Sequence, residues 1–121
     1  MKIQESAQHY LETIFILQKR LGAVRSIDIA TELDYSKPSV SRAVKNLREN
    51  DYITVDEKGY ICLSAKGKQV AETMYERHAT LAAFLISLGV CETVAYEDAC
   101  RIEHVISEES FRCLKTHLEK L

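Results

Sequence analysis

Apolar side chains recur every three or four positions over residues 5–20, and this spacing predicts an amphipathic helix. Lys19 and Arg20 close the segment just before Gly22, which suits the negative C-terminal end of a helix dipole. One face of this helix is expected to lie inward. Its members are Ala7, Tyr10, Leu11, Ile14, Phe15 and Leu17.

Two shorter helices are predicted next. Residues 26–33 carry an apolar face, and Ser26 is expected to cap their first turn. After the short link "DYS", Ser36 is expected to cap a third helix, and Pro38 falls in its first turn, where proline is well tolerated. The apolar positions of this third helix are Val40, Ala43, Val44 and Leu47.

The pattern changes to alternation in "YITVDEKGYICLS", where a charged, glycine-containing turn predicts a two-stranded hairpin. A long helical pattern then runs to Gly89. It is followed by an amphipathic segment over residues 91–106 and by a last helix with Ser107 as its expected cap. The predicted fold class is therefore mainly α, with one small hairpin.

The order helix, helix, hairpin is that of a winged helix-turn-helix. Residues 1–65 are thus predicted to form a DNA-binding domain, and residues 66–121 an all-helical domain. The helix after the tight turn would enter the major groove, with its hydroxyls and cations near bases and phosphates. A helical bundle with a solvated face is the simpler alternative. The expected DNA-binding residues are Ser36, Lys37, Pro38, Ser39, Ser41, Arg42, Lys45 and Lys58.

The charge distribution is compatible with this assignment. Residues 1–68 carry 11 Lys and Arg against 9 Asp and Glu, whereas residues 69–121 carry 5 against 9, so the basic half comes first. There is no apolar run of about 20 residues, so we expect a cytoplasmic protein with no membrane partner. The four cysteines are scattered without CxxC pairs, and reduced thiols are expected.

Potential metal ligands gather outside the predicted DNA-reading helix. In "DACRIEHVISEE", Cys100, Glu103 and His104 stand at positions i, i+3 and i+4, so their side chains share one helical face. Each also has an ordinary explanation, because a lone histidine or a buried cysteine is more often structural. Two further groups extend the candidate set. His9 and Glu12 form an i, i+3 pair on the first predicted helix, and His78 lies on the long helix.

Four segments carry a resemblance to a known family: "HYLETIFIL", "SKPSVSRAVKNLRENDYI", "LSAKGKQVAETMYERHATL" and "ACRIEHVIS". Together they resemble the diphtheria toxin repressor family, which includes iron-dependent and manganese-transport regulators. The resemblance implies a winged-helix domain followed by a helical metal-binding and dimerisation domain. It further implies a homodimer that binds palindromic double-stranded operator DNA when Fe(II) or Mn(II) is present, in the short form with two domains.

The resemblance also assigns ligand roles, and the implied site is mixed. His78, Cys100, Glu103 and His104 fall on family ligand positions, and the thiol is typical of the iron type. Glu12 instead matches a manganese-type ligand. His9 departs from both types, which have Met or Asp there. Two ancillary ligands of the iron type are replaced, by Ala82 and Tyr96.

A single or merged site is therefore expected. Its ligands are His9, Glu12, His78, Cys100, Glu103 and His104. A thiolate and several imidazoles are softer donors than the oxygen-rich set that Mn(II) prefers, so Fe(II) is favoured and Mn(II) ranks second. Zn(II) or Co(II) would also bind in vitro, because affinity rises along the divalent series.

Other functions remain open at this stage. An enzyme with Cys100 as nucleophile and His104 as base would need an oxyanion-binding loop, and none is visible among the four glycines, so no enzyme is expected. A thiol-based redox regulator would keep the DNA-binding half and lose its activity on oxidation. A constitutive DNA-binding module with structural Zn(II) would unfold when the metal is removed.

Overall fold

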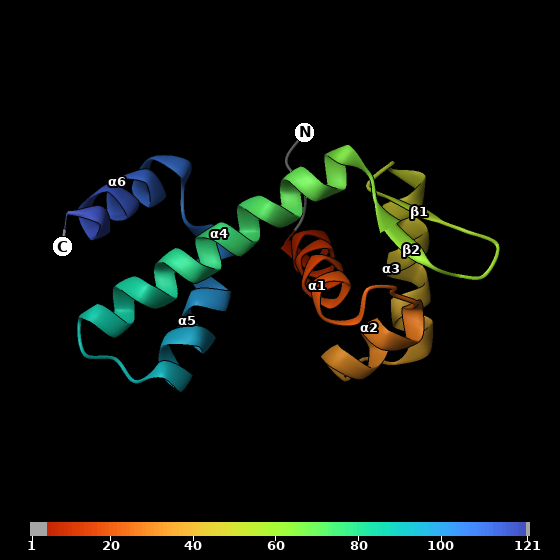
Figure 1. The fold of residues 1–121 in the computed structure, drawn as a ribbon, viewed down its shortest axis with the longest axis horizontal. Helices are drawn as coiled ribbons and strands as arrows, with labels where there is room; N and C mark the ends of the chain where they lie inside the picture. The colour runs from red at the N-terminus through yellow and green to blue at the C-terminus, as the bar shows by residue number, and fades with distance from the viewer. Residues whose placement is uncertain (1–4, 121) are drawn as a thin grey trace. The chain divides into compact units, whose positions relative to one another are not determined.

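The computed structural model describes residues 5–120, and its ribbon is drawn in Figure 1. Six helices and one hairpin follow one another in the described part of the chain. This confirms the mainly α fold class and the predicted order of elements. The elements are α1 (Glu5–Leu21), α2 (Ser26–Leu33), α3 (Lys37–Glu49), β1 (Ile53–Val55), β2 (Ile61–Leu63), α4 (Ala65–Ser87), α5 (Glu92–Val105) and α6 (Glu108–Glu119).

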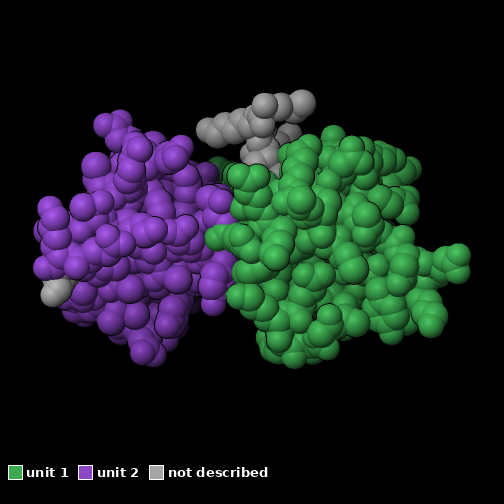
Figure 2. All heavy atoms as spheres, turned by 45° about the horizontal axis from the view of Figure 1, so that its top comes forward, with its two compact units in different colours: residues 1–72 green, residues 73–121 purple. Residues whose placement is uncertain are grey.

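The chain divides into two compact units, which Figure 2 colours green and purple. The division falls between Glu72 and Thr73, inside α4. We call the N-terminal part unit 1 and the C-terminal part unit 2. The predicted domain boundary after residue 65 coincides with the start of α4 and stays a prediction.

The core of unit 1 is built from the apolar positions that the sequence pattern predicted. Leu11, Ile14 and Leu17 project from α1 and are 0 to 1% exposed. Side chains of the link after α1, of α2, α3, the hairpin and the first turns of α4 complete the core, which stabilises all these elements together. They are Val24, Ile29, Ala30, Val40, Val44, Leu47, Ile53, Ile61 and Ala71.

The link between α2 and α3 is a tight turn with well-satisfied ends. Asp34 ends α2 with a φ of 56°, in the left-handed region that aspartate tolerates better than most residues. Ser36 caps α3 as predicted, because its Oγ accepts a hydrogen bond of 3.3 Å from the backbone N–H of Ser39. Tyr35, in the turn itself, packs edge-on against Tyr10 of α1 with ring centroids 6.0 Å apart.

The predicted cap of α2 is wrong by one residue. The helix begins at Ser26 and its N-cap is Arg25. The physical reason is that Asp28, in the first turn, accepts a hydrogen bond of 2.8 Å from the backbone N–H of Arg25. An acid in the third helical position can satisfy the cap residue in this way without a serine at the cap.

The hairpin forms the predicted wing. β1 and β2 are antiparallel and pair Thr54 with Cys62 at their centre. At the turn, Asp56 accepts hydrogen bonds from the backbone N–H groups of Lys58 and Tyr60, both at 2.9 Å. Gly59 has a φ of 86°, which explains why glycine occupies the turn. The wing tip therefore has a defined shape that holds Lys58 outward.

The start of α4 lies very close to the hairpin. A Cβ at Gly67 would stand 2.0 Å from the backbone oxygen of Tyr52, a separation that no side chain permits. The Ser64 hydroxyl fixes the same junction, since it donates to Asp51 O and accepts from Gly67 N–H. Glycine thus allows α4 to begin directly against the wing.

Unit 2 consists of the C-terminal part of α4 together with α5 and α6, and its core is small. Leu81 and Ala82 of α4, Ala99 of α5 and Phe111 of α6 form its buried apolar cluster, all at most 9% exposed. Ser107 caps α6 as predicted, because its Oγ accepts a hydrogen bond of 3.1 Å from the backbone N–H of Ser110.

Among the described residues, no helix is both long and apolar enough to cross a bilayer.

Candidate metal centre and DNA-reading helix

Unit 2 contains a buried carboxylate between two imidazoles. Glu103 on α5 is 0% exposed. One carboxylate oxygen lies 3.2 Å from Nδ1 of His78 on α4, and the other lies 3.3 Å from Nε2 of His104 on α5. Since burying a carboxylate is costly unless charged or hydrogen-bonding partners surround it, this arrangement indicates a polar centre with a specific role.

Local structure explains why these three groups converge. His104 directly follows Glu103 near the end of α5, and α4 runs beside α5 in unit 2, where both contribute to the same apolar core. His78 is further held by Tyr96, whose ring stacks on the imidazole at 5.9 Å between centroids and 18° between planes. Cys100 lies one helical turn before His104 and carries a half-buried thiol.

Unit 1 carries the second set of candidate donors. His9 and Glu12 are three residues apart on α1 and therefore lie on neighbouring positions of one helical face. Glu12 is only 5% exposed, whereas His9 is half-buried. A buried glutamate on an otherwise apolar helix face is unusual, because carboxylates are almost never fully buried without a compensating group.

The donor chemistry of each unit suits a divalent transition metal. Unit 2 offers imidazole, carboxylate and thiol groups, and unit 1 offers one imidazole and one carboxylate. Imidazole binds Fe and Zn well, thiolate adds softness, and carboxylate accommodates Mn. Nearby groups also resemble the supporting groups of metal sites, since Tyr96 fixes the orientation of one imidazole. The residues present therefore fit a metal ion.

The predicted DNA-reading helix is α3. It is amphipathic, with Val40, Val44 and Leu47 buried in unit 1. Its other face is polar and turned to solvent, as recognition of a groove requires. The predicted DNA-binding residues are exposed apart from Ser39, which is half-buried: Ser36, Lys37, Pro38, Ser39, Ser41, Arg42, Lys45 and, on the wing, Lys58.

One feature of this face was not predicted from the sequence. Ser26 and Ile27 of α2 line a hollow of about 240 Å³ together with Lys37 and Ser41 of α3. Ile27 is 48% exposed, although its place in an apolar pattern suggested burial. The pattern could not reveal this, because α2 has only eight residues, and so few positions do not define a single inward face.

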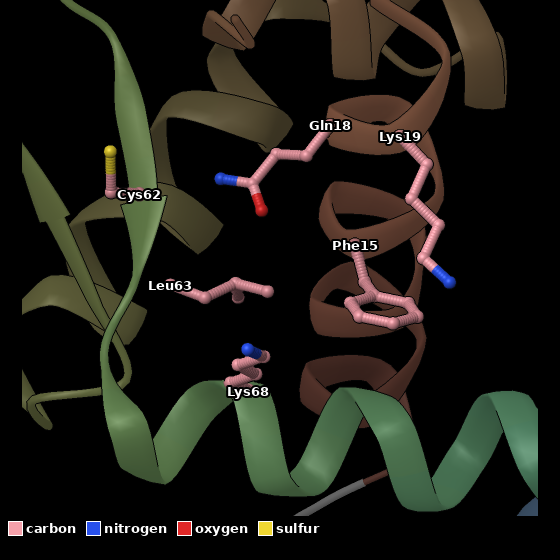
Figure 3. Close-up of a pocket in the computed structure, with 6 residues that line it drawn as sticks. All are labelled: Phe15, Gln18, Lys19, Cys62, Leu63 and Lys68. Atoms are coloured by element: carbon pink, nitrogen blue, oxygen red, sulfur yellow. The ribbon is translucent and has the colours of Figure 1, made fainter. Parts of the chain in front are cut away.

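A second hollow of unit 1 lies between α1, β2 and the start of α4, and Figure 3 shows its lining. Gln18 points toward β2, where its side-chain amide donates to Ile61 O at 3.2 Å. The ammonium of Lys19 lies 4.4 Å from the ring centre of Phe15. None of the candidate metal donors lines this hollow of about 280 Å³. Its lining is Phe15, Gln18, Lys19, Cys62, Leu63 and Lys68.

Two family models match nearly the whole chain. The model described as "Iron dependent repressor, N-terminal DNA binding domain" matches residues 2–61. The model described as "Iron dependent repressor, metal binding and dimerisation domain" matches residues 64–121.

Curated proteins and solved structures agree with these matches. The transcriptional regulator MntR of Escherichia coli is 32% identical over 117 residues, covering 97% of this chain and 76% of that protein. An uncharacterised HTH-type transcriptional regulator of Methanocaldococcus jannaschii is 30% identical over 120 residues, covering 98% of this chain and 96% of that protein. The solved structure of the manganese regulator SloR has a TM-score of 0.83 and 27% identity. This chain is covered completely by SloR but spans only 56% of it.

Proposed function

This chain belongs to the iron-dependent repressor family and is a metal-dependent transcriptional regulator, and we propose that it binds palindromic operator DNA as a homodimer when it is loaded with Fe(II) or Mn(II). Its targets would be genes of metal homeostasis, which it would repress in the cytoplasm. The observation that carries the proposal is the fully buried Glu103 between His78 and His104.

The proposed ligand set contains donors from both units. They are His9, Glu12, His78, Cys100, Glu103 and His104. A bound divalent ion would supply a crosslink between donors that lie far apart in the sequence. Fe(II) ranks first because of the thiol and the three imidazoles, and Mn(II) ranks second because of the two carboxylates. Zn(II) and Co(II) are expected to bind in vitro.

The mechanism follows from where the chain carries these donors. His9 and Glu12 belong to α1, which packs in the same core as the DNA-reading helix α3. The other four donors belong to α4 and α5 of unit 2. If both donor sets bound one ion, unit 1 would be fixed to unit 2, and in a dimer the two α3 helices would be held about 34 Å apart, one turn of DNA. Without a bound ion, the donors of unit 1 and unit 2 would not be held together, and the spacing of the two α3 helices would not be fixed.

Each proposed DNA contact has a chemical role. Ser36 and Pro38, at the start of α3, would touch base edges, with Pro38 suited to a thymine methyl group. Lys58 at the tip of the wing and the exposed Arg42 and Lys45 of α3 would neutralise phosphates. The full proposed set is Ser36, Lys37, Pro38, Ser39, Ser41, Arg42, Lys45 and Lys58.

A homodimer would be formed through unit 2. Leu88 is 67% exposed and Val94 is 44% exposed, on the chain between the end of α4 and the first turns of α5. Ile86 is 36% exposed in the same stretch. Exposed apolar residues that are close in the chain favour burial against a second copy, because a C2 interface is self-complementary.

The test is fluorescence anisotropy under anaerobic conditions. Duplexes are first selected from a random pool by the metal-loaded protein, and chelated protein is then titrated separately with Fe(II), Mn(II) and Zn(II). DNA binding that appears at low micromolar Fe(II) or Mn(II) and disappears with chelator supports the proposal. Binding that ignores metal but is lost on oxidation would instead favour a thiol regulator. Unfolding on chelation would favour a module with structural zinc.

Arg42 gives a separate prediction for the DNA-reading helix. Its guanidinium is exposed and expected to contact phosphate, so Arg42→Ala should weaken binding to all duplexes about equally. The slope of log affinity against log salt should fall by about one. The measurement is a salt titration on the selected duplex and on single-base variants, with Arg112→Ala on α6 as the control. A loss confined to one base position would contradict the phosphate assignment.

A further inference from the structure

We infer that Arg77 is a positioning residue for the metal donors of unit 2, an inference that rests on the proposed metal-binding function. Arg77 carries no donor atom suited to a cation, yet it directly precedes His78 on α4. Its guanidinium holds the last turn of α5 against α4. It thereby sets the place of Glu103 and His104 relative to His78.

The hydrogen bonds of Arg77 lead to the backbone of the donor segment itself. One guanidinium nitrogen, Nη1, donates to the backbone oxygen of Glu103 at 3.1 Å and to that of Ile106 at 2.9 Å. Glu103 is within the last turn of α5, where backbone carbonyls lack partners inside the helix. A cation at this end also interacts favourably with the helix dipole. Glu103, whose carboxylate lies beside His78, is therefore held by Arg77 through its backbone carbonyl.

A third element fixes the position of the guanidinium. Its central carbon lies 5.6 Å from the ring centre of Phe111, within the range of a cation–π contact. Phe111 is a buried residue of α6 and part of the apolar core of unit 2. Arg77 thus contacts both α5 and α6 from its place on α4. It is adjacent to His78 in the sequence and 26 residues away from Glu103.

This geometry bears on metal affinity rather than on stability alone. Apolar contacts among Leu81, Ala99 and Phe111 already pack the three helices together. They do not fix the rotation or the axial position of the last turn of α5, because apolar contacts have little directionality. Two hydrogen bonds from a planar guanidinium do fix them. Groups that orient metal ligands without binding the ion typically change metal affinity by 10- to 100-fold when mutated.

The experiment compares the wild-type chain with the Arg77→Met and Arg77→Lys variants. Methionine keeps most of the aliphatic stem against Phe111 and removes both hydrogen bonds, whereas lysine keeps the charge but replaces the planar guanidinium with a flexible ammonium group. Arg112→Met, on the exposed surface of α6, is the matched control. Co(II) is the probe, because its visible absorption reports coordination geometry as well as affinity. Thermal unfolding of the metal-free proteins is measured in parallel.

We expect Arg77→Met to weaken Co(II) binding about tenfold and to change the absorption bands at saturating Co(II). Arg77→Lys should fall between this variant and the wild type, and it decides the matter if Arg77→Met does not fold. Arg112→Met should match the wild type. A lower unfolding temperature with unchanged Co(II) affinity and spectrum would overturn the inference. If the wild type itself does not bind Co(II), the proposed metal-binding function fails instead.

Discussion

Replacing Glu103 by glutamine is expected to weaken Fe(II) and Mn(II) binding by at least about 100-fold, close to 3 kcal/mol. The side chain keeps its size but loses the charge that faces the two imidazoles of His78 and His104. Because the position is fully buried, water cannot easily replace the lost ligand. Metal-dependent DNA binding should disappear with it. Isothermal titration and anisotropy on the selected duplex measure the two effects.

The matched control is Glu97→Gln, on the same helix but exposed. It makes the same chemical change and should leave both affinities within a factor of two of the wild type. Circular dichroism establishes that the Glu103→Gln protein is helical. Normal metal affinity in a folded Glu103→Gln protein would remove Glu103 from the ligand set and with it the strongest support for the metal centre.

A charge at Val94 is expected to separate the proposed homodimer. Val94→Glu places a carboxylate at one of the exposed apolar positions of the stretch that also includes Ile86 and Leu88. In a two-fold interface each substitution occurs twice, so both the loss of apolar burial and the added charge count double. Loss of the dimer should lower affinity for a palindromic duplex by about 100-fold or more, since the second half-site no longer benefits from linkage.

Sedimentation velocity and anisotropy measure these outcomes together. Thr116→Glu, on the exposed surface of α6, adds the same charge elsewhere in unit 2 and should change neither result. Leu88→Glu should behave like Val94→Glu. A Val94→Glu protein that remains dimeric would place the interface outside this stretch, and a wild-type monomer on DNA would refute the homodimer altogether.

Much of the fold was predictable, because its elements have strong local signals. Period-3.6 spacing in α1 and the serine caps of α3 and α6 required no knowledge of tertiary contacts, and each is confirmed. The cap of α2 was missed because Asp28 satisfies Arg25, a role that depends on side-chain orientation. The close approach at Gly67 was also invisible, since it depends on where the backbone of Tyr52 lies.

The candidate site was predictable in its residue types but less so in its supporting contacts. The spacing of Cys100, Glu103 and His104 indicates one helical face from sequence alone. That His78 meets Glu103 depends on the packing of α4 and α5, which pattern analysis does not provide. The role of Arg77 was missed for the same reason. Its acceptors are backbone oxygens, and these leave no signal in the sequence.

Metal binding and DNA binding are expected to be coupled in this protein, and the Mn(II) affinity with and without the selected duplex measures that coupling. Binding free energies are reciprocal, so the duplex should tighten Mn(II) binding by the same factor by which Mn(II) tightens DNA binding. A factor of 10 to 100 in both directions is expected, about 1.4 to 2.8 kcal/mol. An unchanged Mn(II) affinity in the presence of saturating duplex would contradict the proposed coupling between the two sites.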